Sequence, residues 1–326
     1  PIVILGSLAC RKVPKNLLQN LMIPIFTTVA AKGFINEYKN NSAGIYTGVG
    51  LELTPEIEIL KHTDLVIGIG LCAKEVLSVK KFSCSSINLE SIYTKGIEGF
   101  KFNARISIDN FNQVFNLISD KNWGLDILSK SLLKLNKYLE KDFLPGYVFK
   151  ILNELFVKQP RVVFDTGYFC TIAEHAWKSK DENLCLISSN GRYMGTSIPM
   201  SIGASLANPS VPVIAFIGDG GIGMYVSEIK IAIDNNLPIL FILLSDGGFG
   251  SIRTRALKDG LTQKPLIINS STWLNIFKAF GINGEKCDSV NSLQLAIKNW
   301  KKNYNPLFIE INFSPSKYQK MVNGIR

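Results

Sequence analysis

Two aspartates in glycine-rich loops are the residues whose types and spacing could most readily do chemistry. Asp219 lies in Gly218-Asp219-Gly220-Gly221 directly after an apolar run, and Asp246 follows the next apolar run along the chain. Glycines let the backbone approach phosphate oxygens, and the N terminus of a following helix favours an anion. Asp219, Asp246 and the Gly248 carbonyl could then hold a hard cation such as Mg²⁺ against that anion.

The spacing of the two loops makes this prediction more specific than either loop alone. An isolated Gly-Asp-Gly is common in turns, but here each loop follows a strong strand-like run, 212–217 and 238–244. A helix expected over 223–235 connects them, so the two strands should be parallel neighbours. Their carboxyl ends would then share one edge of a sheet, which is where open α/β sheets bind ligands.

Strand-like runs alternate with amphipathic segments along almost the whole chain. The pattern predicts an α/β fold of two Rossmann-like, doubly wound domains with mainly parallel sheets. We expect one domain in residues 1–122, a partly helical linker in 123–143 and a second domain in 144–326. Expected strands are 2–5, 24–28, 64–70, 84–89, 161–164, 184–188, 212–217, 238–244 and 307–313, and expected helices are 14–22, 54–61, 125–139, 145–157, 169–177, 198–206, 223–235, 271–280 and 289–301.

The bulk composition argues against several classes of protein. The 326 residues are 46% hydrophobic and 19% charged, which allows a large core, and no apolar run is long enough to span a bilayer. The net charge of +10 is spread over Lys- and Asn-rich surfaces, so we expect no nucleic acid and no membrane partner. Six cysteines without a C-x-x-C pair favour reduced thiols in the cytoplasm. The first residue is Pro1 rather than Met, and we therefore expect an excised or processed piece.

Gly218-Asp219-Gly220, the helix after it and the acidic loop one strand later resemble the magnesium–diphosphate motif of thiamine-diphosphate enzymes, most closely the acetolactate-synthase-like group. The resemblance covers nearly the whole chain. It makes residues 1–122 the central domain of such an enzyme and 144–326 its C-terminal diphosphate- and Mg²⁺-binding domain. The other segments that carry it are Thr27–Gly33 (TTVAAKG), Ser42-Ala43-Gly44, Gly48-Val49-Gly50, Val162–Gly167 (VVFDTG) and Ser189–Ile202 (SNGRYMGTSIPMSI).

The resemblance also implies roles for individual residues. Met194 would be the apolar wedge that bends thiamine diphosphate, so that the cofactor can form its own ylid. The Arg192 carbonyl would meet the pyrimidine amino group. The expected cofactor-binding residues are Thr166, Gly167, Tyr168, Phe169, Arg192, Met194, Gly218, Asp219, Gly220, Gly221, Asp246, Gly248 and Phe249, and the expected Mg²⁺ ligands are Asp219, Asp246 and Gly248.

The sequence departs from the family pattern at several of these positions. The family usually has Asn in place of Asp246, so the aspartate adds a negative charge beside the diphosphate. It often has Gly in place of Arg192, whose side chain must point away from the cofactor, toward an anionic substrate or elsewhere. Tyr168 and Phe169 replace more polar residues, which puts direct side-chain contacts to the diphosphate in doubt.

One part of the family's active site has no counterpart here. In the family, a pyrimidine-binding domain precedes the central domain and carries the glutamate that protonates the pyrimidine. The site forms between subunits, so a homodimer or homotetramer is expected. Glu174 and Glu228 lie on helix faces in the wrong domain. We therefore expect the catalytic glutamate on another domain, in cis or on a partner chain, and this chain alone to be inactive.

Several functions stay open. The first is part of a decarboxylase or carboligase acting on a 2-oxo acid or related carbonyl, with Arg253 facing either the substrate carboxylate or solvent. The loop Gly248–Ile252 also resembles the cyclic-dione hydrolase branch. The others are a cofactor-binding subunit that needs a partner, and a non-catalytic module, against which the two retained carboxylates argue. No residue indicates FAD. Gly68-x-Gly70 follows a strand but lacks the third glycine of a dinucleotide fingerprint, so a tight turn is the simpler interpretation.

Overall fold

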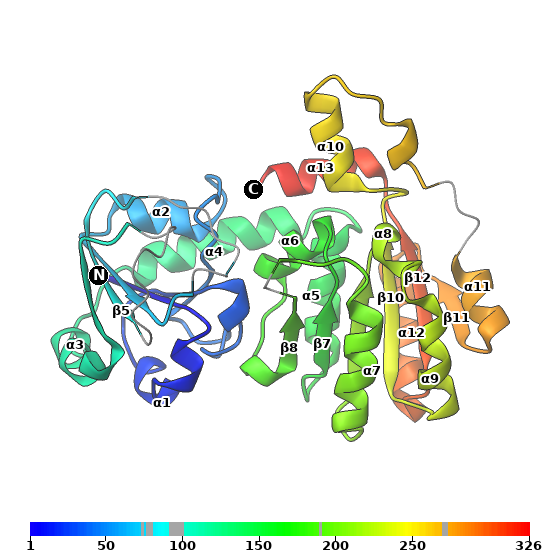
Figure 1. Cartoon of the computed structure of the whole chain (residues 1–326), viewed down its shortest axis with the longest axis horizontal. Helices are drawn as coiled ribbons and strands as arrows, with labels where there is room; N and C mark the ends of the chain where they lie inside the picture. The colour runs from blue at the N-terminus through cyan, green and yellow to red at the C-terminus, as the bar shows by residue number, and fades with distance from the viewer. Residues whose placement is uncertain (73–74, 76–80, 91–100, 189–190, 269–272) are drawn as a thin grey trace.

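The computed structural model describes residues 1–72, 75, 81–90, 101–188, 191–268 and 273–326. Within these ranges it contains two six-stranded sheets, and every strand pairing in them is parallel. The predicted α/β class with two doubly wound sheets is therefore confirmed (Figure 1). Ser189 and Asn190 of the SNGRYMGTSIPMSI segment, and residues 271–272 of one expected helix, lie outside the described residues.

The first sheet has the strand order β3-β2-β1-β4-β5-β6. Its central strands β1 and β4 are buried almost throughout, which is why they read as continuous apolar runs in the sequence. The strands are β1 (Ile2–Leu5), β2 (Ile25–Thr27), β3 (Ser42–Ile45), β4 (Leu65–Ile69), β5 (Ser85–Glu90) and β6 (Ala104–Ser107), with helices α1 (Lys15–Leu18), α2 (Pro55–Lys61) and α3 (Phe111–Ile118) and short 3₁₀ helices at Ala9–Arg11, Val29–Ala31 and Ile108–Asn110.

The second sheet has the order β11-β12-β10-β9-β7-β8. Its strands are β7 (Arg161–Phe164), β8 (Cys185–Ile187), β9 (Val213–Ile217), β10 (Ile239–Ser245), β11 (Asn283–Lys286) and β12 (Leu307–Asn312). Its helices are α5 (Pro145–Leu155), α6 (Tyr168–Ala176), α7 (Ser197–Ala207), α8 (Asp219–Ile222), α9 (Ile229–Asp234), α10 (Gly250–Lys258), α11 (Trp273–Phe280), α12 (Val290–Asn303) and α13 (Pro315–Asn323), with 3₁₀ helices at Glu182–Leu184, Val226–Glu228 and Lys264–Leu266.

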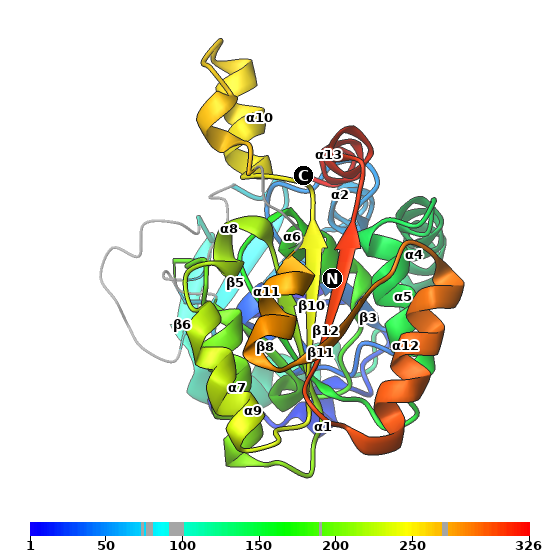
Figure 2. The ribbon, with the colours of Figure 1, turned by 90° about the vertical axis from the view of Figure 1, so that its right-hand side faces the viewer.

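Helices cover both faces of the second sheet. Figure 2 shows α7, α9 and α11 on one side of it, and α5 and α12 on the other. Two apolar clusters correspond to these faces, one containing Ile198, Ile229 and Phe277 and the other containing Phe149 and Trp300. Because both faces are sealed by apolar side chains, ligands can approach the sheet only at its ends.

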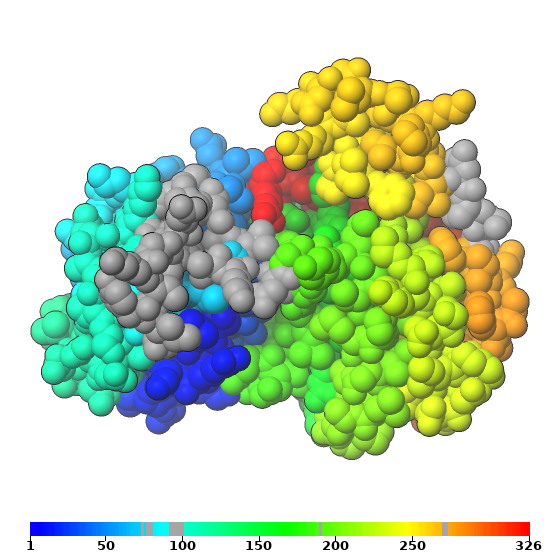
Figure 3. All heavy atoms as spheres, in the orientation of Figure 1, coloured from blue at the N-terminus to red at the C-terminus, as the bar shows by residue number. Residues whose placement is uncertain are grey.

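The two sheets are joined by α4 (Leu125–Leu139), which contacts α2 on one side and α5 and α6 on the other. The predicted linker is thus mostly a packed helix, although the predicted domain bounds themselves stay a prediction. In Figure 1, α13 lies below α10 at the top of the second sheet, with its C-terminal end toward the first domain, while α10 projects beyond the carboxyl end of β10. The same projection is visible on the surface in Figure 3. Among the described residues, no helix is long and apolar enough to cross a membrane.

The helix expected over 223–235 is wrong in its extent. A short helix, α8, already begins at Asp219, and α9 begins only at Ile229. Glycine is a poor helix former, and the glycine-rich segment 218–223 supports just one turn before the chain bends. This early start places the backbone of Asp219 directly at the end of β9.

Candidate functional site

The loops that follow β7, β9 and β10 surround one cavity at the carboxyl edge of the second sheet. β9 is paired with both β7 and β10, so the three loops leave the sheet side by side. Most of the predicted cofactor-binding residues line this cavity, namely Thr166, Gly167, Tyr168, Phe169, Met194, Gly218, Asp219, Gly220, Asp246, Gly248 and Phe249. The convergence of the Asp219 and Asp246 loops therefore occurs as the spacing predicts.

Asp219 ties α8 to the loop after β10. Its Oδ2 accepts hydrogen bonds from the backbone N–H groups of Asp246 (2.8 Å) and Gly247 (3.1 Å), and its Oδ1 accepts one from Ser245 Oγ (2.7 Å). The side chain is almost fully buried, and this burial raises the pKa of Asp219. The carboxylate is thus fixed in position before any ligand arrives.

Asp246 is the second buried carboxylate of the cavity. Burial, followed by the charge of Asp219, raises the pKa of Asp246 to about 6. The Oδ2 atom of Asp246 lies 3.3 Å from Nη2 of Arg253. Arg253 therefore balances the negative charge of Asp246, a charge that the Asn usual in the family at this position would not carry. The same contact shows that the Arg253 guanidinium is turned toward the acidic pair and is mostly buried, with its side chain 13% exposed.

The donor set of Asp219 and Asp246 fits a divalent cation. Two buried carboxylates that oppose each other's ionisation are stabilised together by a positive ion. Among the described residues, no group of three or more His, Cys, Asp or Glu side chains could hold a metal. A cation here would therefore need further oxygen ligands from the backbone, from water or from a bound phosphate.

Asp165, directly after β7, supports the loops around the cavity and was not singled out by sequence analysis. Its Oδ1 accepts a hydrogen bond from Thr166 N (2.8 Å) and its Oδ2 one from Gly195 N (3.0 Å). Gly221 faces the same carboxylate so closely that a Cβ there would collide with Oδ2. Gly221 does not line the cavity, and its expected contact with the cofactor stays a prediction.

Comparison with known proteins finds a family that matches part of the chain. Residues 165–311 match the thiamine pyrophosphate enzyme family, C-terminal TPP binding domain. This part of the chain is therefore similar to the TPP-binding domain of these enzymes. The match spans β8, β9 and β10 and every predicted cofactor-binding residue, from Thr166 to Phe249.

Relatives along the rest of the chain agree with the acetolactate-synthase-like resemblance. A probable acetolactate synthase large subunit of Methanococcus aeolicus is 22% identical over 94% of this chain and 56% of its own length. A 3D-(3,5/4)-trihydroxycyclohexane-1,2-dione hydrolase 2 of Bacillus cereus is 24% identical over 95% of this chain and 56% of its own length. Acetolactate synthase of Bacillus subtilis is 27% identical over 47% of this chain. The chain spans about half the length of the first two relatives.

Two aromatic side chains pack on the glycine loop that borders the cavity. A Cβ on Gly218 would lie 2.9 Å from Cε1 of Phe169, and one on Gly220 would lie 2.6 Å from Cε1 of Phe249. Both rings therefore cover the glycine loop, and only glycine fits beneath them. Sequence analysis questioned whether Phe169 contacts the diphosphate directly. Its ring instead packs on the backbone of the glycine loop.

Tyr318 of α13 is a second residue that sequence analysis missed. It lines the cavity from the C-terminal helix, and its ring centroid lies 6.3 Å from that of Tyr168. The Tyr168 hydroxyl donates a hydrogen bond to Thr254 Oγ1 of α10. Nothing in the sequence marks α13 as part of the site, because its contacts depend on how the chain returns after β12. The other lining residues that were not predicted are Leu244, Gly250, Ser251 and Ile252.

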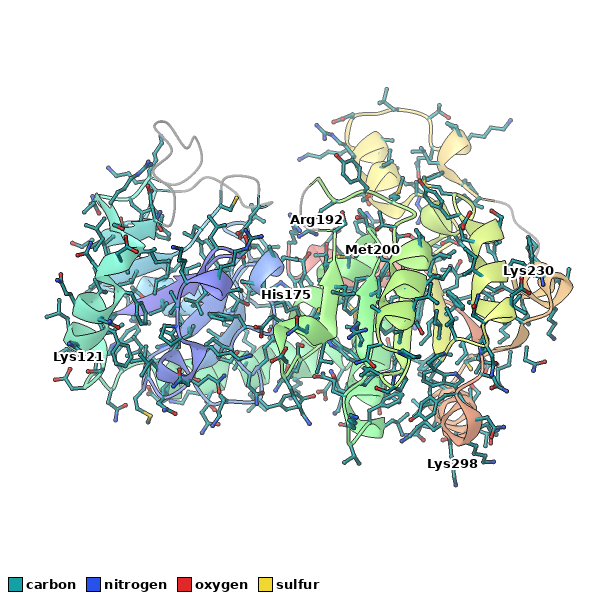
Figure 4. The ribbon with its side chains drawn as sticks, turned by 60° about the horizontal axis from the view of Figure 1, so that its bottom comes forward. Lys121, His175, Arg192, Met200, Lys230 and Lys298 are labelled. Atoms are coloured by element: carbon teal, nitrogen blue, oxygen red, sulfur yellow. The ribbon has the colours of Figure 1, made fainter. Side chains whose placement is uncertain are left out.

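Arg192 does not line the cavity with its side chain. Its Nη1 lies 2.5 Å from Oε1 of Glu174, which is fully buried on α6 instead of occupying a solvated helix face. Figure 4 labels Arg192 near the junction of the two domains, together with His175 of α6. The Arg192 guanidinium therefore forms an ion pair with a buried carboxylate of this chain. The predicted contact of the Arg192 carbonyl with the cofactor stays a prediction.

Proposed function

We propose that this chain supplies the diphosphate- and Mg²⁺-binding half of a thiamine-diphosphate enzyme acting on a 2-oxo acid or a related carbonyl compound, as a decarboxylase or carboligase of the acetolactate-synthase type. The observation that carries the proposal is the meeting of Asp219 and Asp246, from neighbouring strands, in one cavity of a TPP-binding domain. The probable acetolactate synthase large subunit that matches 94% of this chain supports the reaction class.

In this proposal, Asp219, Asp246 and the Gly248 carbonyl hold Mg²⁺, and the cation holds the diphosphate. Bound thiamine diphosphate supplies an electron sink for carbon–carbon bond chemistry. Thr166 and the start of α6 border the diphosphate, and the rings of Phe169 and Phe249 exclude water from it. Met194 supports the cofactor from the cavity wall.

The catalytic glutamate is proposed to lie on a pyrimidine-binding domain, either elsewhere in a longer protein or on a partner chain. Within the site as described, Glu174 cannot take that role because both of its oxygens face arginines. Activity would then need assembly, as a homodimer or homotetramer, and these residues alone would bind cofactor without turning over substrate. All six cysteines are free, which fits a cytoplasmic protein.

A carbon–carbon bond hydrolase is the second candidate function. It is favoured by the dione-hydrolase relative, which matches this chain over almost its whole length. The same loop that resembled this branch in sequence, Gly248–Ile252, lines the cavity. Both candidates use the same cofactor site and differ in the substrate and in the reaction that follows its binding.

The cofactor site can be tested by calorimetric titration of thiamine diphosphate into the full-length protein in the presence of Mg²⁺. We expect Asp219→Ala to weaken Mg²⁺-dependent binding by at least about 100-fold, since the cation loses a charged ligand (about 2.7 kcal/mol). Asp234→Ala, which removes an exposed carboxylate from α9, should bind as the wild type does. Undiminished thiamine diphosphate affinity in folded Asp219→Ala would contradict the assignment of Asp219 as a Mg²⁺ ligand.

A further inference from the structure

Glu174, a buried carboxylate outside the cavity, lies on one of the segments that line the cavity and contacts arginines next to two others. Glu174 is fully buried on α6. Its Oε1 lies 2.5 Å from Nη1 of Arg192, and its Oε2 lies 3.7 Å from Nη1 of Arg326. A buried charge is stable only with partners, so this carboxylate and its two arginines must hold their relative positions.

Each member of the cluster belongs to a segment that lines the cavity. Helix α6, which carries Glu174, begins with Tyr168 and Phe169. Arg192 stands two residues before Met194, and Arg326 follows α13, which carries Tyr318. The two ion pairs of Glu174, and the contacts between α13 and α6, place all three segments around one carboxylate.

The segment 191–195 is held in a conformation that most residues avoid. Gly191, Arg192 and Gly195 have φ values of +89°, +49° and +82°. Left-handed backbone is readily adopted by glycine but costs about 1 kcal/mol or more for other residues. Arg192 nevertheless adopts it, and its guanidinium reaches Glu174. At the other end, Gly195 N donates to Asp165 Oδ2, so Met194 lies between two anchored residues.

We infer that Glu174 is a positioning residue: through its ion pair with Arg192 it holds the segment 191–195 so that Met194 forms a wall of the cofactor cavity. The inference rests on the proposed function, because it concerns the cavity assigned to thiamine diphosphate. Arg326 contacts the same carboxylate at a longer distance and links α13 to it. Removing the Glu174 charge should therefore loosen the Met194 wall while leaving the Asp219 and Asp246 loops in place.

If Glu174 only stabilised the fold, its loss would not change cofactor affinity specifically. The chain contains a second buried ion pair that serves as a control for this case. Lys32 and Glu37 form another buried ion pair, with Nζ and Oε1 2.9 Å apart and side chains 2% and 4% exposed. Lys32 also donates to the Glu174 carbonyl, so this pair touches the same helix without lining the cofactor cavity. Glu37→Gln therefore reproduces the loss of a buried carboxylate but spares the segment 191–195.

The experiment compares Glu174→Gln, Arg192→Gly and Glu37→Gln in the full-length protein. Arg192→Gly removes the ion pair while keeping a residue that adopts positive φ freely. Thiamine diphosphate affinity is measured by calorimetry at saturating Mg²⁺, and amide hydrogen exchange is followed in peptides covering 191–195. We expect Glu174→Gln and Arg192→Gly each to weaken affinity about tenfold and to speed exchange in these peptides. The double variant should be no worse than either single one.

Glu37→Gln should lower the melting temperature without changing affinity or exchange in 191–195. Wild-type affinity and wild-type exchange in Arg192→Gly would overturn the inference, even if Glu174→Gln failed to fold. If the wild-type protein itself did not bind thiamine diphosphate, the proposed function would fail. The exchange data would then still decide whether Glu174 holds this segment.

Discussion

Three buried aspartates at the carboxyl edge of the second sheet differ in what they contact. Asp165 accepts hydrogen bonds from Thr166 and Gly195, and Asp219 accepts them from the loop after β10. Asp246 instead faces Arg253. The sequence predicted Asp219 and Asp246 from their loops, because glycines after a strand form a local pattern. The pairing of Asp246 with Arg253, one turn into α10, was not predicted, since the direction of the Arg253 side chain depends on the surrounding fold.

Asp165 should make the stability of the protein depend on pH. Burial raises the pKa of Asp165 from 3.8 to about 6. Since the folded pKa lies above the unfolded value, the stabilising contribution is complete below about pH 4 and is lost as the pH rises through about 6. The difference between the folded and unfolded pKa of Asp165 corresponds to at most about 3 kcal/mol of the free energy of unfolding. Asp165→Asn should therefore show a smaller fall in the free energy of unfolding between pH 4 and 7, measured by urea denaturation.

The free energy of unfolding of Asp165→Asn should still fall somewhat between pH 4 and 7. The reason is that the pKa of Asp246 is also raised to about 6, so Asp246 loses its proton over the same pH range. Identical pH profiles for the wild type and Asp165→Asn would contradict the assignment of this pH dependence to Asp165.

At the scale of elements, the turn from β9 into α8 determines the shape of the site. The apolar runs predicted the central strands well, because strands buried on both faces are continuous in sequence. The strands β3, β6 and β11 and the helices α3, α10 and α13 were not predicted. β6 and β11 are largely exposed and contain polar residues, so they lack the apolar signal that marks a core strand.

Gly221→Ala should disrupt this turn. The new Cβ would collide with Asp165 Oδ2, and the loops after β7 and β9 would have to separate, at a cost of about 1–3 kcal/mol. Gly203→Ala on α7 is the matched control, because nothing lies within 4 Å of its Cβ. Alanine there should be neutral or stabilise the protein by about 0.4–1 kcal/mol. Chemical denaturation of both variants checks the prediction, and equal effects would show that the Asp165–Gly221 contact is looser than described.

At the scale of the whole molecule, buried hydrogen bonds and a surface ion pair cross the junction of the two domains. Glu37 accepts a hydrogen bond from Ser179 N (2.6 Å), and Lys32 donates to the Glu174 carbonyl (3.1 Å). Lys15 pairs at the surface with Asp181 (2.7 Å). The sequence predicted two domains but not this junction, because its contacts join residues more than a hundred positions apart, for which a single sequence gives no local signal.

Lys32→Met should destabilise the protein by about 3–5 kcal/mol, because it leaves the Glu37 carboxylate buried without its cation. Lys15→Ala should cost less than about 1 kcal/mol, since that pair is partly exposed and screened by solvent. Urea unfolding of both variants separates the two cases. A Lys15→Ala effect as large as that of Lys32→Met would mean that the surface pair, rather than the buried one, holds the junction.

The most direct test of the cation and cofactor site is a crystal structure of the full-length protein grown with thiamine diphosphate and Mn²⁺ in place of Mg²⁺. Mn²⁺ accepts the same oxygen ligands and gives an anomalous signal. We predict an anomalous peak bonded to carboxylate oxygens of Asp219 and Asp246 and to the diphosphate, with Met194 against the cofactor. A cofactor bound elsewhere, or a peak that contacts neither aspartate, would contradict the account.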